Sequence, residues 1–240
     1  MKSIAARLVL PLLAVPALAL LAGCGEDAAQ RVDPAAHDAF FYWAGVKPNA
    51  ALARAKTVYL LAGEVRAQGG PYVPLRAVPR LRGREVWMVV RSERLGWDED
   101  IHARILRDLD RWRAAGNPMT GLQIDFDART RGLGDYRAFL ADLRQRLPRR
   151  YRLSITGLMD WSAQGDAKAL ASLAGVADEV VIQTYQGRRT IPGYDDYMAS
   201  LMRLPLPYKV GLVEGGEWRA PPELARDPEF RGYVVFLLPH

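Results

Sequence analysis

Apolar runs with the character of β-strands recur along the chain at intervals of about one strand and one helix. Eight such runs follow residue 38, and they span residues 39–45, 57–65, 85–93, 121–128, 152–161, 179–187, 208–214 and 232–238. Several are apolar on both faces, as in Val86–Val90 and Val180–Ile182. Runs of that kind suit parallel strands that are covered on both sides. The pattern therefore predicts eight buried parallel strands.

The segments between these runs have the spacing of amphipathic helices. In the clearest segment, Asp98 is a candidate N-cap and Gly116 a candidate stop. The apolar helix faces consist of Ile101, Ile105, Leu109 and Trp112, then Tyr136, Phe139, Leu140, Leu143 and Leu147, and then Leu170, Leu173 and Val176. This alternation predicts an α/β fold, a (β/α)8 TIM-type barrel, with an open doubly wound sheet as the alternative. No glycine-rich phosphate loop follows the first strand, which disfavours a nucleotide-binding sheet.

The barrel is expected to be minimal. Residues 66–84 contain Gly69, Gly70 and three prolines, so a loop should replace most of the second helix. The sequence stops soon after the eighth strand, so the eighth helix should be missing. Both gaps would leave apolar barrel surface exposed unless the segment before residue 39 or a partner covers it.

The N-terminal segment has the features of a signal peptide. Residues 1–7 carry Lys2 and Arg7 without an acid, and residues 8–22 are apolar but too short to span about 30 Å of hydrocarbon. The sequence Leu-Ala-Gly-Cys at residues 21–24 resembles the bacterial lipobox, which implies cleavage before Cys24 and acylation of its thiol. An ordinary signal peptide with a chance cysteine is the alternative. We therefore expect a signal peptide (1–23), a lipidated Cys24 with a polar tether (24–38) and a barrel domain (39–240), anchored in the bacterial cell envelope through Cys24 alone.

Composition excludes several classes of function. The 240-residue chain has one cysteine and three histidines, too few for a structural zinc site of about four ligands. Its net charge of +6 arises from 33 basic and 27 acidic residues, which are interleaved along the chain. Nucleic-acid binding favours basic residues clustered on one face, so nucleic acid is not an expected partner. No cofactor is expected either.

Polar and aromatic residues gather at the ends of the expected strands. In a (β/α)8 barrel the C-terminal strand ends carry the functional site. The residues found there are Tyr42, Trp43, Glu64, Arg91, Asp125, Asp127, Asp160, Trp161, Gln183, Tyr185, Glu214, Glu217 and Trp218. Aromatic faces stack on sugar rings, and carboxylates and amides bind hydroxyl groups. The set predicts a carbohydrate site without a bound metal, with a glycan or cell-wall fragment as its ligand.

The fourth strand carries the strongest candidate chemistry. Gln123, Asp125 and Asp127 alternate along it, so they share one face. The two carboxylates lie roughly 7 Å apart along the strand. Their repulsion, together with partial burial, should raise one pKa and favour a retained proton, as a general acid requires. A structural pair that holds a loop or Arg91 is the alternative.

Segment 121–127, Gly-Leu-Gln-Ile-Asp-Phe-Asp, resembles the fourth-strand signature of chitinase-like glycosidases, D-x-x-D-x-D-x-E in a (β/α)8 barrel. The resemblance implies that Gln123 and Asp125 match the two later aspartates. It also implies that Asp127 matches the glutamate that protonates the leaving oxygen. Segment 183–186 resembles that family's M-x-Y-D, whose tyrosine supports the reacting N-acetyl group, and here the tyrosine is Tyr185. The chain departs from both patterns, with Gln123 and Gln186 in place of acids and the shorter Asp127 in place of Glu.

A bacterial family called domain of unknown function 3142, whose members are often lipoproteins, is a closer resemblance. Three segments of the chain resemble the hallmarks of this family: residues 123–127, residues 153–158 followed by Trp161, and residues 182–187. The resemblance spans most of residues 39–238 and implies a barrel similar to that of the glycosidases.

Three functions remain open at this point. In a glycoside hydrolase acting on an amino-sugar glycan such as peptidoglycan, Asp127 would be the acid/base and Asp125 would tune its pKa. Glu214 would then be the nucleophile, unless the substrate's own acetamido group attacks. In a non-catalytic carbohydrate-binding or envelope-assembly lipoprotein, Gln123 and the aromatic residues would only bind substrate. A Mg²⁺ or Ca²⁺ site formed by Asp125, Asp127 and Glu214 is the third alternative.

Overall fold

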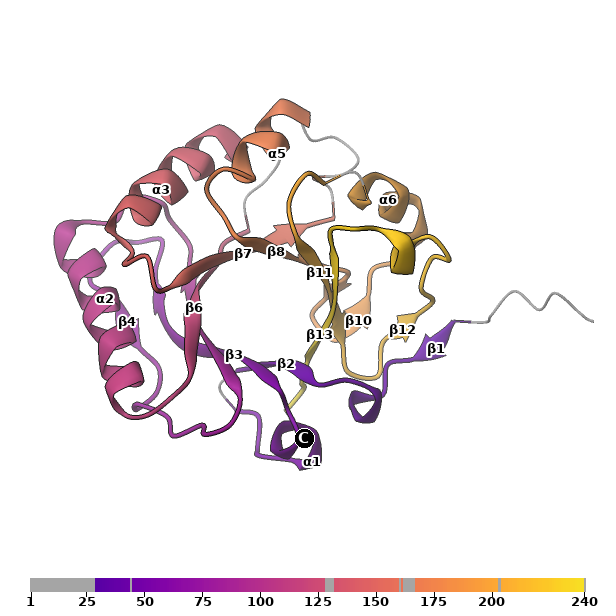
Figure 1. Cartoon of the computed structure of the whole chain (residues 1–240), viewed down its shortest axis with the longest axis horizontal. Helices are drawn as coiled ribbons and strands as arrows, with labels where there is room; N and C mark the ends of the chain where they lie inside the picture. The colour runs from indigo at the N-terminus through magenta and orange to yellow at the C-terminus, as the bar shows by residue number, and fades with distance from the viewer. Residues whose placement is uncertain are drawn as a thin grey trace, which may run out of the picture.

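A closed barrel of eight parallel strands forms the fold (Figure 1). The computed structural model describes residues 29–43, 45–127, 132–159, 161, 167–202 and 204–239, so the expected signal peptide, Cys24 and Asp160 lie outside the described residues. The barrel strands are β2 (Ala39–Tyr42), β3 (Thr57–Val65), β5 (Glu85–Ser92), β6 (Met119–Asp125), β7 (Arg152–Leu158), β8 (Glu179–Gln183), β11 (Tyr208–Val213) and β13 (Phe230–Phe236). Each strand pairs with the next, and β13 returns to β2. The TIM-type barrel is confirmed, and the open-sheet alternative is wrong because the first and last strands are hydrogen-bonded.

Helices cover only part of the outside of the barrel (Figure 1). Among the described residues they are α1 (Ala50–Ala53), α2 (Glu99–Ala114), α3 (Leu133–Arg146), α5 (Ala167–Leu173), α6 (Tyr194–Leu201) and the 3-10 turns η1 (Pro34–Ala36) and η3 (Leu224–Arg226). As expected, the Asp98 carboxylate caps α2 by accepting from the N–H of Ile101 at 2.9 Å, and Gly116 follows with a φ of 86°. Within the described part of the chain, no helix is both long and apolar enough to cross a membrane.

A loop takes the place of the second helix, as expected. Residues 66–84 are all described, and they contain the short strand β4 (Val73–Pro74) but no helix. β4 pairs antiparallel with β3, and the buried Tyr72 beside it belongs to the hydrophobic core. The Arg76 guanidinium donates to the backbone carbonyls of Leu61 and Tyr42 and so holds the rest of the loop against the barrel.

The segment before the barrel packs on the outside of the barrel near β13, and residues 237–239, the last described, form no helix. Strand β1 (Gln30–Arg31) pairs with β12 (Glu217–Trp218) on the outer side of β13 (Figure 1). Val32 is buried and exchanges backbone hydrogen bonds with Gly215 and Gly216. Residues 29–38 therefore pack against the barrel, although the polar composition of residues 24–38 predicted a tether. Val32 adds an apolar side chain to the hydrophobic core at this place.

The barrel interior combines an apolar cluster with a buried polar network. The apolar cluster consists of Ala39, Phe41, Tyr59, Leu61, Trp87, Val89, Val181 and Val234. The Glu179 carboxylate accepts from the Tyr59 hydroxyl at 2.6 Å and from the Ser154 hydroxyl at 3.1 Å. Lys209 lies 3.7 Å from the same carboxylate and donates to the Tyr59 oxygen at 2.9 Å. The buried charge is thus paired and hydrogen-bonded, as burial in a low dielectric requires. This network lies toward the amino-terminal ends of the barrel strands, away from the mouth.

Candidate active site

A cavity of about 620 Å³ opens at the carboxyl ends of the barrel strands. Its walls are formed by Trp43, Arg91, Asp125, Asp127, Leu158, Met159, Gln183, Tyr185, Gln186, Gly187, Ile191, Tyr197 and Phe236. A second cavity of about 460 Å³ shares Arg91, Asp125 and Asp127 with it and continues toward Gly132 and Asp135 at the start of α3. Arg91 and the two aspartates therefore lie at the boundary between the two cavities and line both of them.

Asp125 is the buried member of the aspartate pair, with 7% of its surface exposed. Burial is the main reason that its pKa rises from the ordinary 3.8 to about 6, and the charge of Asp127 raises it further. The Thr156 hydroxyl donates to Oδ1 at 3.0 Å and, like the charge of Arg91, opposes the shift. One carboxyl of the pair was expected to have a raised pKa, and this carboxyl is that of Asp125. Its burial raises the pKa more than the repulsion by Asp127 does.

Asp127 follows the end of β6 and is exposed at the mouth of the barrel. Among the described residues, no side chain or backbone group forms a hydrogen bond or ion pair with its carboxylate. Such a carboxylate is available to a ligand in either cavity.

Aromatic residues form one wall of the larger cavity. The ring centroids of Trp43 and Phe236 are 5.4 Å apart, and those of Tyr185 and Phe236 are also 5.4 Å apart. Burial raises the pKa of Tyr185 well above its usual range, and the charges of Asp125 and Asp127 add to the effect. The Tyr185 phenol therefore stays protonated and can donate a hydrogen bond near both carboxylates.

Six of the residues predicted to act at the site line this cavity: Trp43, Arg91, Asp125, Asp127, Gln183 and Tyr185. Arg91, Asp125 and Gln183 lie on β5, β6 and β8, Tyr185 begins β9 (Tyr185–Gln186), and Trp43 and Asp127 follow the ends of β2 and β6. Five separate segments therefore converge on one space. Whether each residue acts on a substrate stays a prediction.

Gln123 and Glu214 do not line either cavity. Gln123 is fully buried one layer below Asp125, and its amide donates to the Ser154 hydroxyl at 2.9 Å. Glu214 lies just after β11. Lys209 of this strand faces the barrel interior, so alternation directs the odd-numbered side chains inward and the even-numbered ones, including Glu214, outward. Its carboxylate accepts from the N–H of Leu238 at 2.8 Å. The expectation that Glu214 faces the same cavity as Asp127 is therefore wrong, and Glu214 is not placed to act as nucleophile.

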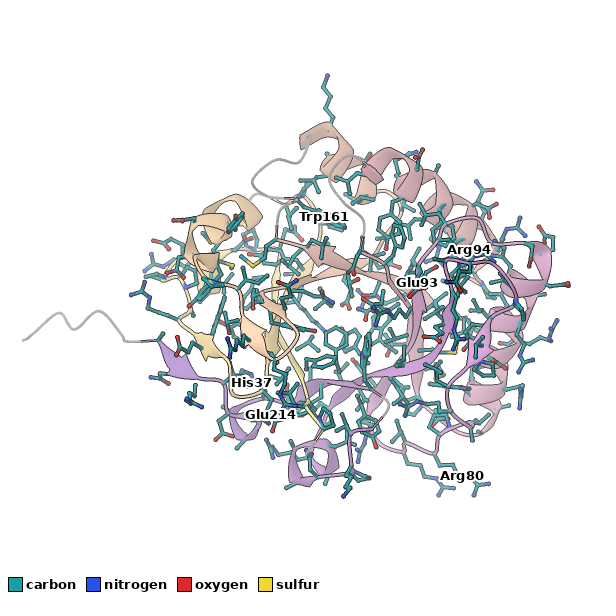
Figure 2. All side chains as sticks on the ribbon, turned by 180° about the vertical axis from the view of Figure 1, so that it is seen from behind. His37, Arg80, Glu93, Arg94, Trp161 and Glu214 are labelled. Carbon is teal, nitrogen blue, oxygen red and sulfur yellow. The ribbon has the colours of Figure 1, made fainter. Side chains whose placement is uncertain are left out.

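Three further predicted residues also lie away from the cavity. Glu64 is ion-paired with Arg66 at 2.6 Å. Trp161 is 1% exposed and packs in the core beside Tyr136, with ring centroids 6.4 Å apart. Trp218 stacks on Tyr194 at 4.8 Å. Figure 2 shows Trp161 and Glu214 on different sides of the barrel.

Four residues that contribute to the site are not found by analysis of strand ends. Thr156 shares a face of β7 with Ser154, so alternation within residues 152–158 was a usable signal. Phe236 lies within the eighth apolar run, residues 232–238, and is the last residue of β13, so its position could have been recognised in the same way. Tyr197 comes from α6 and Met159 from a turn, and neither carries a local signal.

The described residues contain no group of three or more His, Cys, Asp or Glu side chains arranged to hold a metal ion. The metal site considered from the sequence requires Glu214 beside Asp125 and Asp127. Glu214 instead binds the backbone at Leu238, so these three carboxylates do not form one site.

The fold is similar to solved structures of glycan-active proteins. The chitinase domain of the spore coat protein CotE from Clostridium difficile aligns with a TM-score of 0.50 and 14% identity, over 80% of this chain and 67% of that one. The Bacillus cereus spore cortex-lytic enzyme SleL aligns with a TM-score of 0.51 and 17% identity, over 73% of this chain and 50% of that one. At these identities the similarity shows the fold alone.

No curated protein matches the sequence. Residues 82–199 match the family described as Domain of unknown function (DUF3142). The matched segment runs from just before β5 into α6, so it includes Arg91, both aspartates, Gln183 and Tyr185. Residues 82–199 are therefore similar to the DUF3142 family model, and they form the part of a minimal TIM-type barrel that carries most of the cavity.

Proposed function

We propose that this protein hydrolyses a glycan containing N-acetylated amino sugars, with Asp127 as the general acid. The observation that carries the proposal is the convergence of Asp125, Asp127 and Tyr185 on one cavity with an aromatic wall. Similarity to a chitinase domain and to a cortex-lytic enzyme supports a glycan as the ligand. The cavity volume lies within the range of small-molecule sites.

The attacking group in this proposal is the substrate's own acetamido oxygen. Retaining glycosidases with a protein nucleophile place two carboxyls about 5–5.5 Å apart across the scissile bond. Glu214, the candidate for that role, binds the backbone of Leu238 outside the cavity. Attack by the acetamido carbonyl oxygen on C1 requires no second carboxylate from β11 and leaves Asp127 to handle the proton.

The proposed hydrolysis has two steps. The acetamido oxygen bonds to C1 while the C1–O bond to the leaving sugar breaks, and the Asp127 proton moves to the leaving oxygen. Water then adds to C1, the cyclic intermediate opens, and the water proton returns to Asp127. Asp127 is exposed in the free protein, so a bound sugar that covers it must displace water from its carboxyl.

Asp125 has a different role in this reaction. Its ionised form can accept the acetamido N–H and balance the positive charge that develops on the ring formed by attack. Thr156 directs its hydroxyl to Oδ1 and leaves Oδ2 for the substrate. Tyr185, whose raised pKa keeps its proton in place, can donate to the acetamido group.

We further propose that the protein acts in the bacterial cell envelope, held to a membrane through an acylated Cys24. The lipobox-like residues 21–24 and the apolar residues 8–22 before them support this location. An amino-sugar polymer of the cell wall would then be the accessible substrate.

The direct test is a hydrolysis screen of the purified protein against chitin oligosaccharides, N-acetylated aryl glycosides and soluble cell-wall fragments. New reducing ends, identified by mass spectrometry, are the expected result. The wild-type protein and an Asp127→Asn variant are compared on each substrate. Equal release of reducing ends by both would contradict the assignment of Asp127, and no release from any substrate would contradict the hydrolase proposal.

A non-catalytic glycan-binding protein is the second candidate. Its supporting observation is that Asp125 and Asp127 are the only carboxylates among the described residues that line the larger cavity. Binding of intact oligosaccharides without any turnover, with the same affinity in wild type and Asp127→Asn, favours this candidate.

A further inference from the structure

Arg91 is the only cationic residue among the described residues that line either cavity at the barrel mouth. It lies on β5 directly beside Asp125 of β6, with the two residues paired in the strand register. No ion pair within 4.0 Å and no hydrogen bond is formed by its guanidinium with any described residue. Its contact is with the ring of Trp43, whose centroid lies 5.6 Å from the guanidinium carbon.

Other arginines at the same end of the barrel are used differently. Arg76 donates to two backbone carbonyls, Arg94 donates to the carbonyls of Arg66 and Gly70, and Arg66 pairs with Glu64. These side chains hold loops in place. The five N–H donors of Arg91 are not used in that way, although Arg91 faces the space where a ligand would lie.

The position of Arg91 is also unsuited to a purely structural role beside Asp125. Its charge opposes the rise in the Asp125 pKa, but Asp125 receives its hydrogen bond from Thr156. The Trp43 ring holds the guanidinium by a cation–π contact, which orients it without using its N–H groups. An oriented guanidinium with free donors matches a planar carboxylate, which it can bind through two parallel hydrogen bonds.

We infer that Arg91 recognises a carboxylate on the glycan, so that the ligand is an acidic amino-sugar glycan and not a neutral one. The inference rests on the proposed function for the identity of the cavity as a glycan site, and it narrows the substrate class. Two chemical sources supply such a group: an ether-linked lactic acid on an amino sugar, or the carboxylate of a uronic acid. Both present a planar anion that a guanidinium can bind in the same manner.

The test is a calorimetric titration of the full chain in an Asp127→Asn background, in which the ligands remain intact. Four disaccharides are compared: N-acetylglucosaminyl-N-acetylmuramic acid, its carboxyl methyl ester, an N-acetylglucosamine–glucuronic acid pair and di-N-acetylchitobiose. Arg91→Met, which keeps the apolar stem over Trp43, and Arg91→Lys, which keeps the charge, are added to this background. Arg107→Met serves as the matched control, because Arg107 is exposed on α2 and forms no hydrogen bond or ion pair with any described residue.

Arg91→Met is expected to weaken binding of one or both acidic disaccharides at least about tenfold, as loss of a charge-assisted hydrogen bond implies. The methyl ester and chitobiose should bind Arg91→Met and its parent equally, and Arg91→Lys should give an intermediate affinity for the acid. Arg107→Met should change nothing. The acidic ligand that responds identifies the source of the carboxylate.

Equal losses for acidic and neutral ligands would overturn the inference, because they would mean that Arg91 acts through Asp125 or the shape of the cavity. Tighter binding of the neutral disaccharides by the parent protein would also overturn it. This test measures affinity alone, so its failure leaves hydrolysis intact. Conversely, a protein without turnover can still show the acid-specific loss.

Discussion

The Thr156 hydroxyl donates to Oδ1 of Asp125 at 3.0 Å while it accepts the backbone N–H of Phe126 at 3.3 Å. Because the hydroxyl oxygen is occupied by the N–H, its single hydrogen is directed at the carboxylate. This contact favours the ionised form of Asp125, whereas burial favours the neutral form. Of the two groups that limit how far the Asp125 pKa rises, Thr156 has a larger effect than Arg91.

Replacing Thr156 with Val keeps the shape of the side chain but removes the hydroxyl. We expect the Asp125 pKa to rise by about one further unit, since a hydrogen bond to a charged group contributes about 1.5–3 kcal/mol. Carbon-13 NMR titration of the Asp carboxyl groups measures this directly. Thr156→Ser is the matched control and should leave the titration close to that of wild type. A Val variant that titrates with wild type would show that the hydroxyl does not act on Asp125.

The raised pKa of Asp125 also predicts how stability depends on pH. Folding raises this pKa from 3.8 to about 6, so between these values the folded protein binds more protons than the unfolded chain. The free energy of unfolding should therefore fall as the pH rises from about 4 through about 6, by at most about 3 kcal/mol in total, and this group contributes little further change above about pH 7.

Asp125→Asn tests this dependence, because Asn removes the charge and keeps an oxygen for Thr156. In urea unfolding, the variant should equal wild type near pH 4 and exceed it by about 1–3 kcal/mol at pH 8. Glu223→Gln, at an exposed carboxylate, is the control and should show no such trend. A variant that is less stable than wild type at pH 8 would indicate that the Asp125 charge is stabilising.

Asp127→Asn is expected to lose turnover and keep both fold and affinity for neutral glycans. Asn cannot donate the acidic proton, and loss of general acid catalysis lowers the rate roughly 10²–10⁴-fold. The Asp127 carboxylate is exposed and has no hydrogen-bond partner among the described residues, so the thermal midpoint should stay within about 2 °C. A large drop in Tm would favour a structural role, in which breaking a paired charge destabilises the fold by about 3–5 kcal/mol.

Cys24→Ser is expected to release the protein into the soluble fraction with its fold unchanged. The lipid would be the sole attachment, and a serine hydroxyl does not replace the thiol that receives it. Cell fractionation followed by immunodetection measures the distribution, and circular dichroism checks the fold. If the Ser variant sediments with membranes after a salt wash, a different attachment holds the protein.

Local pattern was sufficient to predict the elements that depend on neighbouring residues. Leu122 and Ile124 alternate with Gln123 and Asp125, and the structure places the first pair in the outer core and the second pair inside the barrel. The cap of α2 at Asp98 follows the same logic, because a capping carboxylate binds an N–H only three residues away.

The alternation of residues within a strand does not predict how deep a side chain lies along the barrel axis. Gln123 and Asp125 share one inward face, but Gln123 binds Ser154 in the filled interior and Asp125 reaches the cavity. Where the interior ends depends on the stagger of all eight strands. A residue within one strand carries no information about that stagger.

Residues just beyond the strand ends were the least predictable. Glu214 binds the backbone at Leu238, Trp161 enters the core and Trp218 stacks on Tyr194, although all three follow a barrel strand. Each turn sets the direction of the side chain through contacts with distant segments. Tyr197, which does reach the cavity, comes from a helix and could not be assigned to it.

By itself, the sequence determined where the strands lie along the chain, which side chains within a strand share a face and the aspartate pair of the fourth strand, because alternation and caps act over a few residues. Only the tertiary structure decided which polar residues share the cavity. Ring closure brings β2 and β13 together and so joins Trp43 to Phe236 across most of the chain's length. It also decided that Asp125 is the carboxyl with the raised pKa, because burial is a property of the whole barrel and not of one strand.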